Sequence, residues 1–174
     1  MSQVLVAVVM GVSGSGKTTV ARALADAWGA TFLDADDFHS EQARAHMASG
    51  QPLTDEMRRP WVERIAADLR RRVEAGERVA LAFSGLRRQH RAMLREAGLP
   101  LRFVFLHGDR ELIAGRMRAR SGHYMPVSLL DSQFAALEPP QGEADVHAVA
   151  IDAPPEQVLA RALAALDQGP PLRE

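Results

Sequence analysis

Several residue types and patterns are rare or absent in this chain of 174 residues. It has no cysteine, which excludes disulfides, thiolate metal sites and cysteine nucleophiles and is typical of the reducing cytoplasm. Its formal net charge of −1 lacks the basic excess of most nucleic-acid-binding proteins. The apolar run at residues 4–10 is too short to span a membrane. We therefore expect a cytoplasmic protein that binds neither nucleic acid nor a membrane.

Lysine is almost absent as well, because only Lys17 represents it among 21 lysine and arginine residues. Lys17 belongs to the octet Gly-Val-Ser-Gly-Ser-Gly-Lys-Thr at residues 11–18, which fits the P-loop pattern G-x-x-x-x-G-K-[ST] at every fixed position. In a P-loop an ammonium group reaches between the β- and γ-phosphates, where a planar guanidinium fits poorly. The motif predicts that a nucleoside triphosphate is bound by Gly11, Val12, Ser13, Gly14, Ser15, Gly16, Lys17, Thr18 and Thr19.

The surroundings of this octet favour a P-loop over a flexible glycine–serine turn. A continuous apolar run precedes it and a helical pattern at residues 18–28 follows it. A buried parallel strand, a glycine-rich turn and a helix N-terminus together direct backbone N–H groups at phosphate. Thr18 is placed to bind Mg²⁺ through its hydroxyl group. The dinucleotide pattern G-x-G-x-x-G fails, because Thr19 replaces its third glycine.

The rest of the chain alternates strand and helix patterns. Apolar segments predict strands at residues 4–10, 31–34, 78–83, 101–107 and 146–151. Helices are expected at 54–75, 87–97, 109–120, 126–138 and 155–167, with Gly76 ending the first of these. This alternation indicates an α/β fold, a five-stranded parallel sheet covered by helices on both faces. We expect one domain over residues 1–167 and a frayed tail at 168–174.

Two aspartates follow the second predicted strand, at the end of the sheet where ligands bind in open α/β folds. We expect Asp34 to help hold Mg²⁺. Asp36 would accept the proton of the hydroxyl group that attacks the γ-phosphate. The alternative is a capping or turn cluster, since aspartate favours both.

Arginines supply candidate anion sites. Arg87 follows Ser84 and Gly85 at the end of the third predicted strand, where a small residue and a glycine permit close approach of a substrate. Arg116 and Arg120 lie four residues apart on one helix face, before a segment with turn chemistry. They suit a lid, at about residues 116–138, that neutralises the transferring phosphoryl group. The alternatives are solvated basic faces.

The histidines and methionines give little indication of function. The six histidines show no zinc-site spacing. Met47, Met57, Met93 and Met117 are interpreted as core or interface filler.

Assembled, these residues resemble the small P-loop kinases that phosphorylate gluconate. Beyond the P-loop, the resemblance is carried by Asp34-Ala-Asp36-Asp37-Phe-His39, by Arg59-Pro60-Trp61, by residues 47–55 and 84–91, and by the block from His123 through Gln133 to Pro139. It implies a nucleoside-monophosphate-kinase-like fold, ATP with Mg²⁺, transfer to the 6-hydroxyl group of D-gluconate, and a homodimer. Acceptor-site residues implied by the resemblance are Asp36, His39, Ser84, His123 and Gln133.

The acceptor has a second, coarser indication. Arg58, Arg59 and the region of Arg87 suit an anionic small molecule, because guanidinium groups pair with carboxylates. The chain departs from the family pattern near this site, notably at Ala43, His46 and Met57, and also at Ser40, Phe83 and Gly85. Two alternatives to gluconate transfer therefore stay open. One is a kinase of another small acid such as shikimate, and the other is a nucleotide-binding regulator without catalysis.

Overall fold

The computed structural model describes residues 3–51, 53–119 and 127–167. Five strands form one parallel sheet in the order β2-β3-β1-β4-β5. Their bounds are β1 Val6–Met10, β2 Ala30–Asp34, β3 Arg78–Ala82, β4 Leu101–His107 and β5 Val146–Ala150. All five predicted strands are confirmed. The chain fills one side of β1 and then the other, so the crevice at the carboxyl end of β1 is the expected ligand site.

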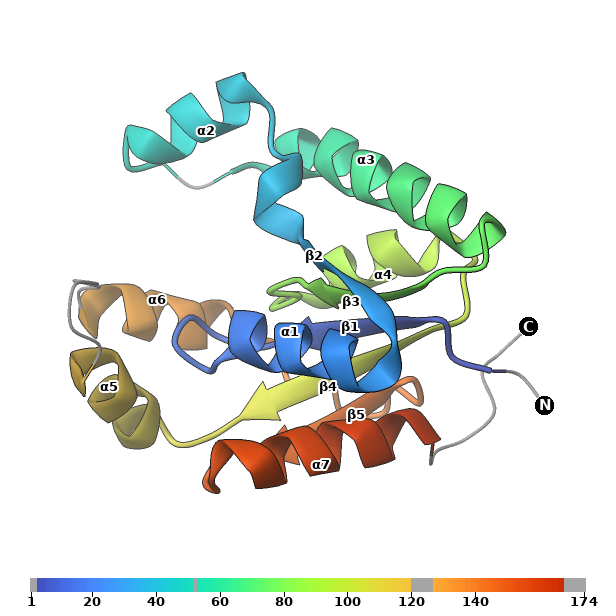
Figure 1. Ribbon diagram of the computed structural model, residues 1–174. Helices are drawn as coiled ribbons and strands as arrows, with labels where there is room; N and C mark the ends of the chain where they lie inside the picture. The colour runs from blue at the N-terminus through green and yellow to red at the C-terminus, as the bar shows by residue number, and fades with distance from the viewer. Residues whose placement is uncertain (1–2, 52, 120–126, 168–174) are drawn as a thin grey trace.

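Helices cover both faces of the sheet (Figure 1). On one face α1 (Lys17–Trp28) and α7 (Pro155–Asp167) pack in a core cluster with α5 (Arg110–Ala119) and α6 (Val127–Ala136). On the other, α3 (Asp55–Glu74) and α4 (Arg88–Arg95) form a second cluster. Strand β1 serves both clusters, because Ala7 and Val9 face the first and Val6, Val8 and Met10 the second. This alternation confirms the predicted three-layer α/β fold.

Helix α3 shows the predicted stripe most clearly. Trp61, Ile65 and Leu69 are buried in the second cluster, as their four-residue spacing indicates. The helix ends at Glu74, and Gly76 follows with φ +84°. That left-handed conformation favours glycine and terminates the helix.

Two elements near the second strand were not predicted. A 3₁₀ turn, η1 (Ala35–Phe38), follows β2, and α2 (Glu41–Ala48) lies out beyond the main layers (Figure 1). Of the residues in α2 only Ala43 is buried, so the sequence of this helix has no apolar stripe that would predict it. Ser40 caps it by accepting a hydrogen bond from the Ala43 N–H at 3.1 Å. Met47 lies on this helix with its side chain exposed, so the prediction that it packs in the core is wrong.

Among the residues that the structure describes, no helix combines the length and apolar character needed to cross a membrane.

Candidate active site

The predicted P-loop connects β1 to the N-terminus of α1. Gly11, Gly14 and Gly16 all have positive φ, at 152°, 81° and 92°. At Gly11 a Cβ atom would lie 2.8 Å from the Leu106 carbonyl oxygen and 2.7 Å from Ser15 Oγ, so only glycine fits. Gly16 caps α1 without a side-chain hydrogen bond, which leaves the first N–H groups of the helix for an anion.

Lys17 lies at the centre of the site. Its Nζ donates to the carbonyl oxygens of Gly11 at 2.9 Å and Val12 at 3.1 Å. Burial lowers the pKa of Lys17 to about 8, while the nearby carboxylates of Asp36 and Asp34 act in the opposite direction. The structure therefore brings together the lysine and the two aspartates that the sequence singled out.

Asp34 and Asp36 differ in their surroundings. Asp34 Oδ1 accepts a hydrogen bond from the Asp36 N–H at 2.9 Å and so caps η1, as the alternative interpretation expected. Burial raises the pKa of Asp34, an effect that this hydrogen bond partly offsets. Asp36 instead exposes 85% of its side chain. An exposed carboxylate beside the P-loop lysine is accessible to a substrate.

Aromatic stacking supports the turn that carries Asp36. His39 stacks on Trp61 with ring centroids 4.3 Å apart, and its Nε2 lies 3.7 Å from Asp36 Oδ1. Burial lowers the pKa of His39, while Asp36 favours the charged ring. The Nδ1 atom of His39 is buried and has no hydrogen-bond partner among the described residues. The edge of His39 that approaches Asp36 is its Nε2 atom.

A cationic cluster lies at the start of α3 and α4. Arg58 Nη1 donates to the Leu53 carbonyl at 2.9 Å and lies 3.8 Å from Asp55 Oδ1. Burial, followed by the charge of Arg58, lowers the pKa of His90, whose Nε2 lies 3.4 Å from the same Asp55 oxygen. Burial lowers the pKa of Arg58 and of His90, and the positive charge of Arg87 adds to this lowering at both residues. The structure thus groups Arg58 with Arg87, and adds Asp55 and His90.

Arg59 does not belong to this cluster. It is exposed and lies 3.6 Å from Glu96 on the surface, because the next residue of a helix points about 100° away. The structure therefore does not group Arg59 with Arg58 and Arg87.

Ser84 and Gly85 lie beside the P-loop. The Ser84 carbonyl accepts a hydrogen bond from the Gly11 N–H at 3.2 Å. Gly85 has φ +58°. Its carbonyl oxygen accepts a hydrogen bond from Nη1 of the fully buried Arg91 at 2.6 Å. Arg91 was missed, although a visible signal exists. It lies three residues before Leu94, on the buried face of α4, where an arginine indicates a paired buried charge.

The predicted lid residues are only partly described. Arg120 and His123 lie outside the described residues. Arg116 donates to the Ile151 carbonyl at 2.5 Å. Gln133, grouped with the acceptor residues by resemblance, instead contacts the P-loop: its Oε1 accepts a hydrogen bond from the Ser13 N–H at 3.2 Å.

The residues present fit Mg²⁺ bound together with nucleotide phosphates. Such an ion is usually held by one or two protein oxygens plus phosphate and water. Thr18 is exposed in the first turn of α1, and the Asp34 carboxylate lies close enough to Lys17 to affect its pKa. No group of three histidine, cysteine or acidic side chains that could hold a metal occurs among the described residues.

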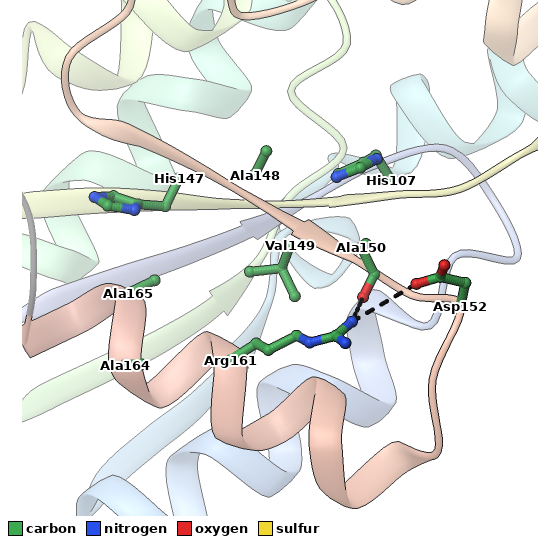
Figure 2. A pocket seen from close by; sticks show the side chains of 9 residues that line it. All are labelled: His107, His147, Ala148, Val149, Ala150, Asp152, Arg161, Ala164 and Ala165. Atoms are coloured by element: carbon green, nitrogen blue, oxygen red, sulfur yellow. Dashed lines mark hydrogen bonds and ion pairs between the residues drawn. The ribbon is translucent and has the colours of Figure 1, made fainter.

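A hollow of about 450 Å³ lies elsewhere, along β5 and α7 (Figure 2). Arg161 crosses it, donating to the Ala150 carbonyl at 2.9 Å and lying 3.7 Å from Asp152. Figure 2 shows His107 and His147 well apart on neighbouring strands. The lining contains none of the P-loop, acceptor or lid residues predicted above.

The fold and the site together define a P-loop phosphotransferase. The family model described as "AAA domain" matches residues 6–140. A shikimate kinase from Bacteroides thetaiotaomicron shares the fold, with a TM-score of 0.65 at 18% identity over 94% of this chain and 99% of that one.

Relatives at higher identity give the family. A probable gluconokinase of Rattus norvegicus is 41% identical over 179 aligned positions, covering 92% of this chain and 97% of its own. The crystal structure of a gluconokinase from Sinorhizobium meliloti 1021 has a TM-score of 0.83 at 42% identity, with 95% of this chain and 92% of that one covered. This chain belongs to the gluconokinase family.

Proposed function

We propose that the protein transfers the γ-phosphoryl group of ATP to the 6-hydroxyl group of D-gluconate. The observation that carries this proposal is the placement of the Lys17 ammonium near Asp34 and Asp36, with the Arg58–Arg87 cluster as an anion site nearby. Membership of the gluconokinase family supports the choice of acceptor.

The P-loop backbone and Lys17 bind the phosphates, and Asp36 accepts the proton of the attacking hydroxyl group. As the new O–P bond forms, the bond from the γ-phosphorus to the bridging oxygen breaks and ADP leaves. Thr18 and Asp34 would hold Mg²⁺, which neutralises phosphate charge when bound. Arg116 and Arg120, in a lid at about 116–138, stabilise the transferring group. Arg116 must leave the Ile151 carbonyl to do so.

The acceptor is held by its carboxylate and its hydroxyl groups. Arg58, which is half-buried, and Arg87, which is exposed, pair with the carboxylate, since guanidinium groups bind carboxylates through paired hydrogen bonds. His39, whose Nε2 lies beside Asp36, contacts a hydroxyl group of the acceptor. Ser84 and His123 complete the acceptor site. Family resemblance supports a homodimer, and the absence of cysteine fits a cytoplasmic location.

The test is a coupled assay of ADP release with Mg·ATP and, in parallel, D-gluconate, shikimate, nucleoside monophosphates and no acceptor. Turnover that depends on gluconate supports the proposal. Turnover only with another acid would identify that acid as the acceptor in place of gluconate. It would also indicate that Ala43, His46 and Met57 alter the acceptor pocket. Tight ATP binding without turnover on any acceptor favours a regulator.

A further inference from the structure

One short segment of the chain contacts both halves of the candidate active site. Within α6, Gln133 Oε1 accepts from the Ser13 N–H of the P-loop. Just beyond α6, the Glu138 N–H donates to the Leu86 carbonyl at 2.7 Å, and Glu138 Oε1 accepts from the Arg88 N–H at 3.3 Å. The segment from Gln133 to Glu138 therefore connects the P-loop to the turn between β3 and α4.

Arg91 strengthens the second of these attachments. Its guanidinium is fully buried and donates to the Glu138 carbonyl at 3.0 Å and to the Gly85 carbonyl at 2.6 Å. It also binds both carboxylate oxygens of Glu143, at 3.0 and 2.7 Å. Charge-assisted bonds of this kind hold geometry closely. One side chain thus fixes the position of Glu138 relative to the turn at Gly85.

The segment between the two attachments is helical for most of its length. The Leu137 N–H donates to the Gln133 carbonyl at 3.0 Å, which continues the helical hydrogen bonding to Leu137, the residue before Glu138. Leu130 is fully buried in the core cluster that also contains Val12 of the P-loop and Leu86 of the turn. Helical hydrogen bonds and the burial of Leu130 thus make the backbone from α6 to Leu137 one continuous element between the two attachments.

The contact at Ser13 also competes with nucleotide. Backbone N–H groups of a P-loop are donors to phosphate oxygens. The Gln133 carboxamide oxygen takes one such donor. Beside it, Met117 of α5 packs where a Cβ atom on Gly14 would lie, 2.6 Å from Met117 Cγ. Side chains of α5 and α6 thus cover the loop that phosphate would enter.

We propose that Gln133 is a positioning residue that couples nucleotide binding to acceptor binding. Phosphate displaces its oxygen from Ser13, and the segment to Glu138 carries this displacement to the turn that bears Ser84 and Arg87. The identity of the acceptor in this inference rests on the proposed function. By thermodynamic linkage, each ligand changes the affinity for the other by the same factor.

The test measures dissociation constants by calorimetry for a non-hydrolysable Mg·ATP analogue and for D-gluconate, each alone and with the other at saturation. Wild type should show a coupling factor of about five or more. Gln133→Ala should bind the analogue about two- to ten-fold more tightly, because no side chain competes for Ser13, and its coupling factor should fall to about one. Gln133→Glu should bind the analogue more weakly, because its carboxylate repels phosphate. Gln157→Ala, on the exposed surface of α7, should match wild type.

Two results would overturn the inference. One is unchanged analogue affinity and unchanged coupling in Gln133→Ala. The other is a gluconate affinity that this variant weakens equally with and without the analogue, because that pattern marks a direct acceptor ligand. If wild type binds no gluconate, the proposed function fails. The nucleotide measurements then decide alone: opposite shifts in the Ala and Glu variants support displacement at Ser13, and equal affinities refute it.

Discussion

The imidazole ring of His39 lies nearly parallel to the indole ring of Trp61, with 16° between their planes. Trp61 stacks in turn on Phe83, with centroids 5.5 Å apart. Its Nε1–H donates to the buried Ala35 carbonyl at 2.7 Å. These contacts join α3 to the ends of β2 and β3. They hold the turn that presents Asp36 to the P-loop.

Replacing Trp61 by phenylalanine should separate ring packing from hydrogen bonding. Trp61→Phe keeps an aromatic ring but leaves the Ala35 carbonyl without its donor, which should lower the free energy of unfolding by about 1–3 kcal/mol. We expect kcat to fall as the η1 turn loosens, with the KM for ATP unchanged. Urea unfolding and steady-state kinetics measure both effects. Trp28→Phe, at the end of α1, is the control, and an equal loss of kcat there would refute the role of the stack.

Two adjacent aspartates allow a matched test of the proposed base. Asp36→Asn should lower kcat by about 10²–10⁴-fold, because an amide does not accept the proton of the acceptor hydroxyl group. Asp37→Asn, also on the exposed side of η1, should retain nearly full activity. Calorimetry should show unchanged ATP affinity for both variants. If Asp36→Asn remains active, another group is the base.

Adjacent arginines test the anion site in the same way. Arg58 is half-buried in the cluster with Asp55 and His90, whereas Arg59 pairs with Glu96 on the surface. Arg58→Lys should raise the KM for gluconate about ten-fold or more, because lysine lacks the paired donors that bind a carboxylate. The KM for ATP should stay the same. Arg59→Lys should leave both constants unchanged, and equal effects of the two variants would exclude Arg58 as the carboxylate ligand.

The lowered pKa of Lys17 predicts proton uptake when ATP binds. With a pKa of about 8, about three quarters of the enzyme carries neutral Lys17 at pH 8.5. Phosphate favours the charged ammonium and raises this pKa. Binding should therefore take up about 0.7 proton at pH 8.5 but only about 0.1 at pH 7, and affinity should fall as the pH rises above 8.

Calorimetry in buffers of different ionisation enthalpy measures this uptake. Lys17→Met should abolish it, while weakening binding. Uptake that persists in Lys17→Met would assign the proton to another group.

Arg91 should matter to stability far more than an exposed arginine. Arg91→Met leaves Glu143 with the Arg95 partner alone and removes the donor to Gly85. We expect a loss of about 3–5 kcal/mol in the free energy of unfolding, as for a broken buried ion pair. Arg71→Met removes an exposed arginine from Asp68, which keeps its bond to Arg72, and should cost about 0–1 kcal/mol. Chemical denaturation compares the two, and similar losses would show that the Arg91 network contributes little.

The order of elements could be predicted because it depends on local patterns. Apolar runs of strand length reflect strands that are buried on both faces of the sheet. The four-residue spacing of Trp61, Ile65 and Leu69 reflects a helix that is buried on one face. Helix α2 was not predicted, because Ala43 is its only buried residue. A helix that buries little leaves no periodic signal in the sequence.

The sequence by itself determined the P-loop, since its fixed spacing of glycines and Lys17 follows from local backbone geometry, and it determined the α/β alternation. Tertiary structure alone decided which distant residues meet. Gln133 reaches Ser13, Arg91 joins Gly85 to Glu143, and Asp55 pairs with His90. These pairs lie on different elements, and their contact depends on how the helices pack on the sheet. Side-chain packing of that kind is a property of the whole fold, so no local pattern encodes it.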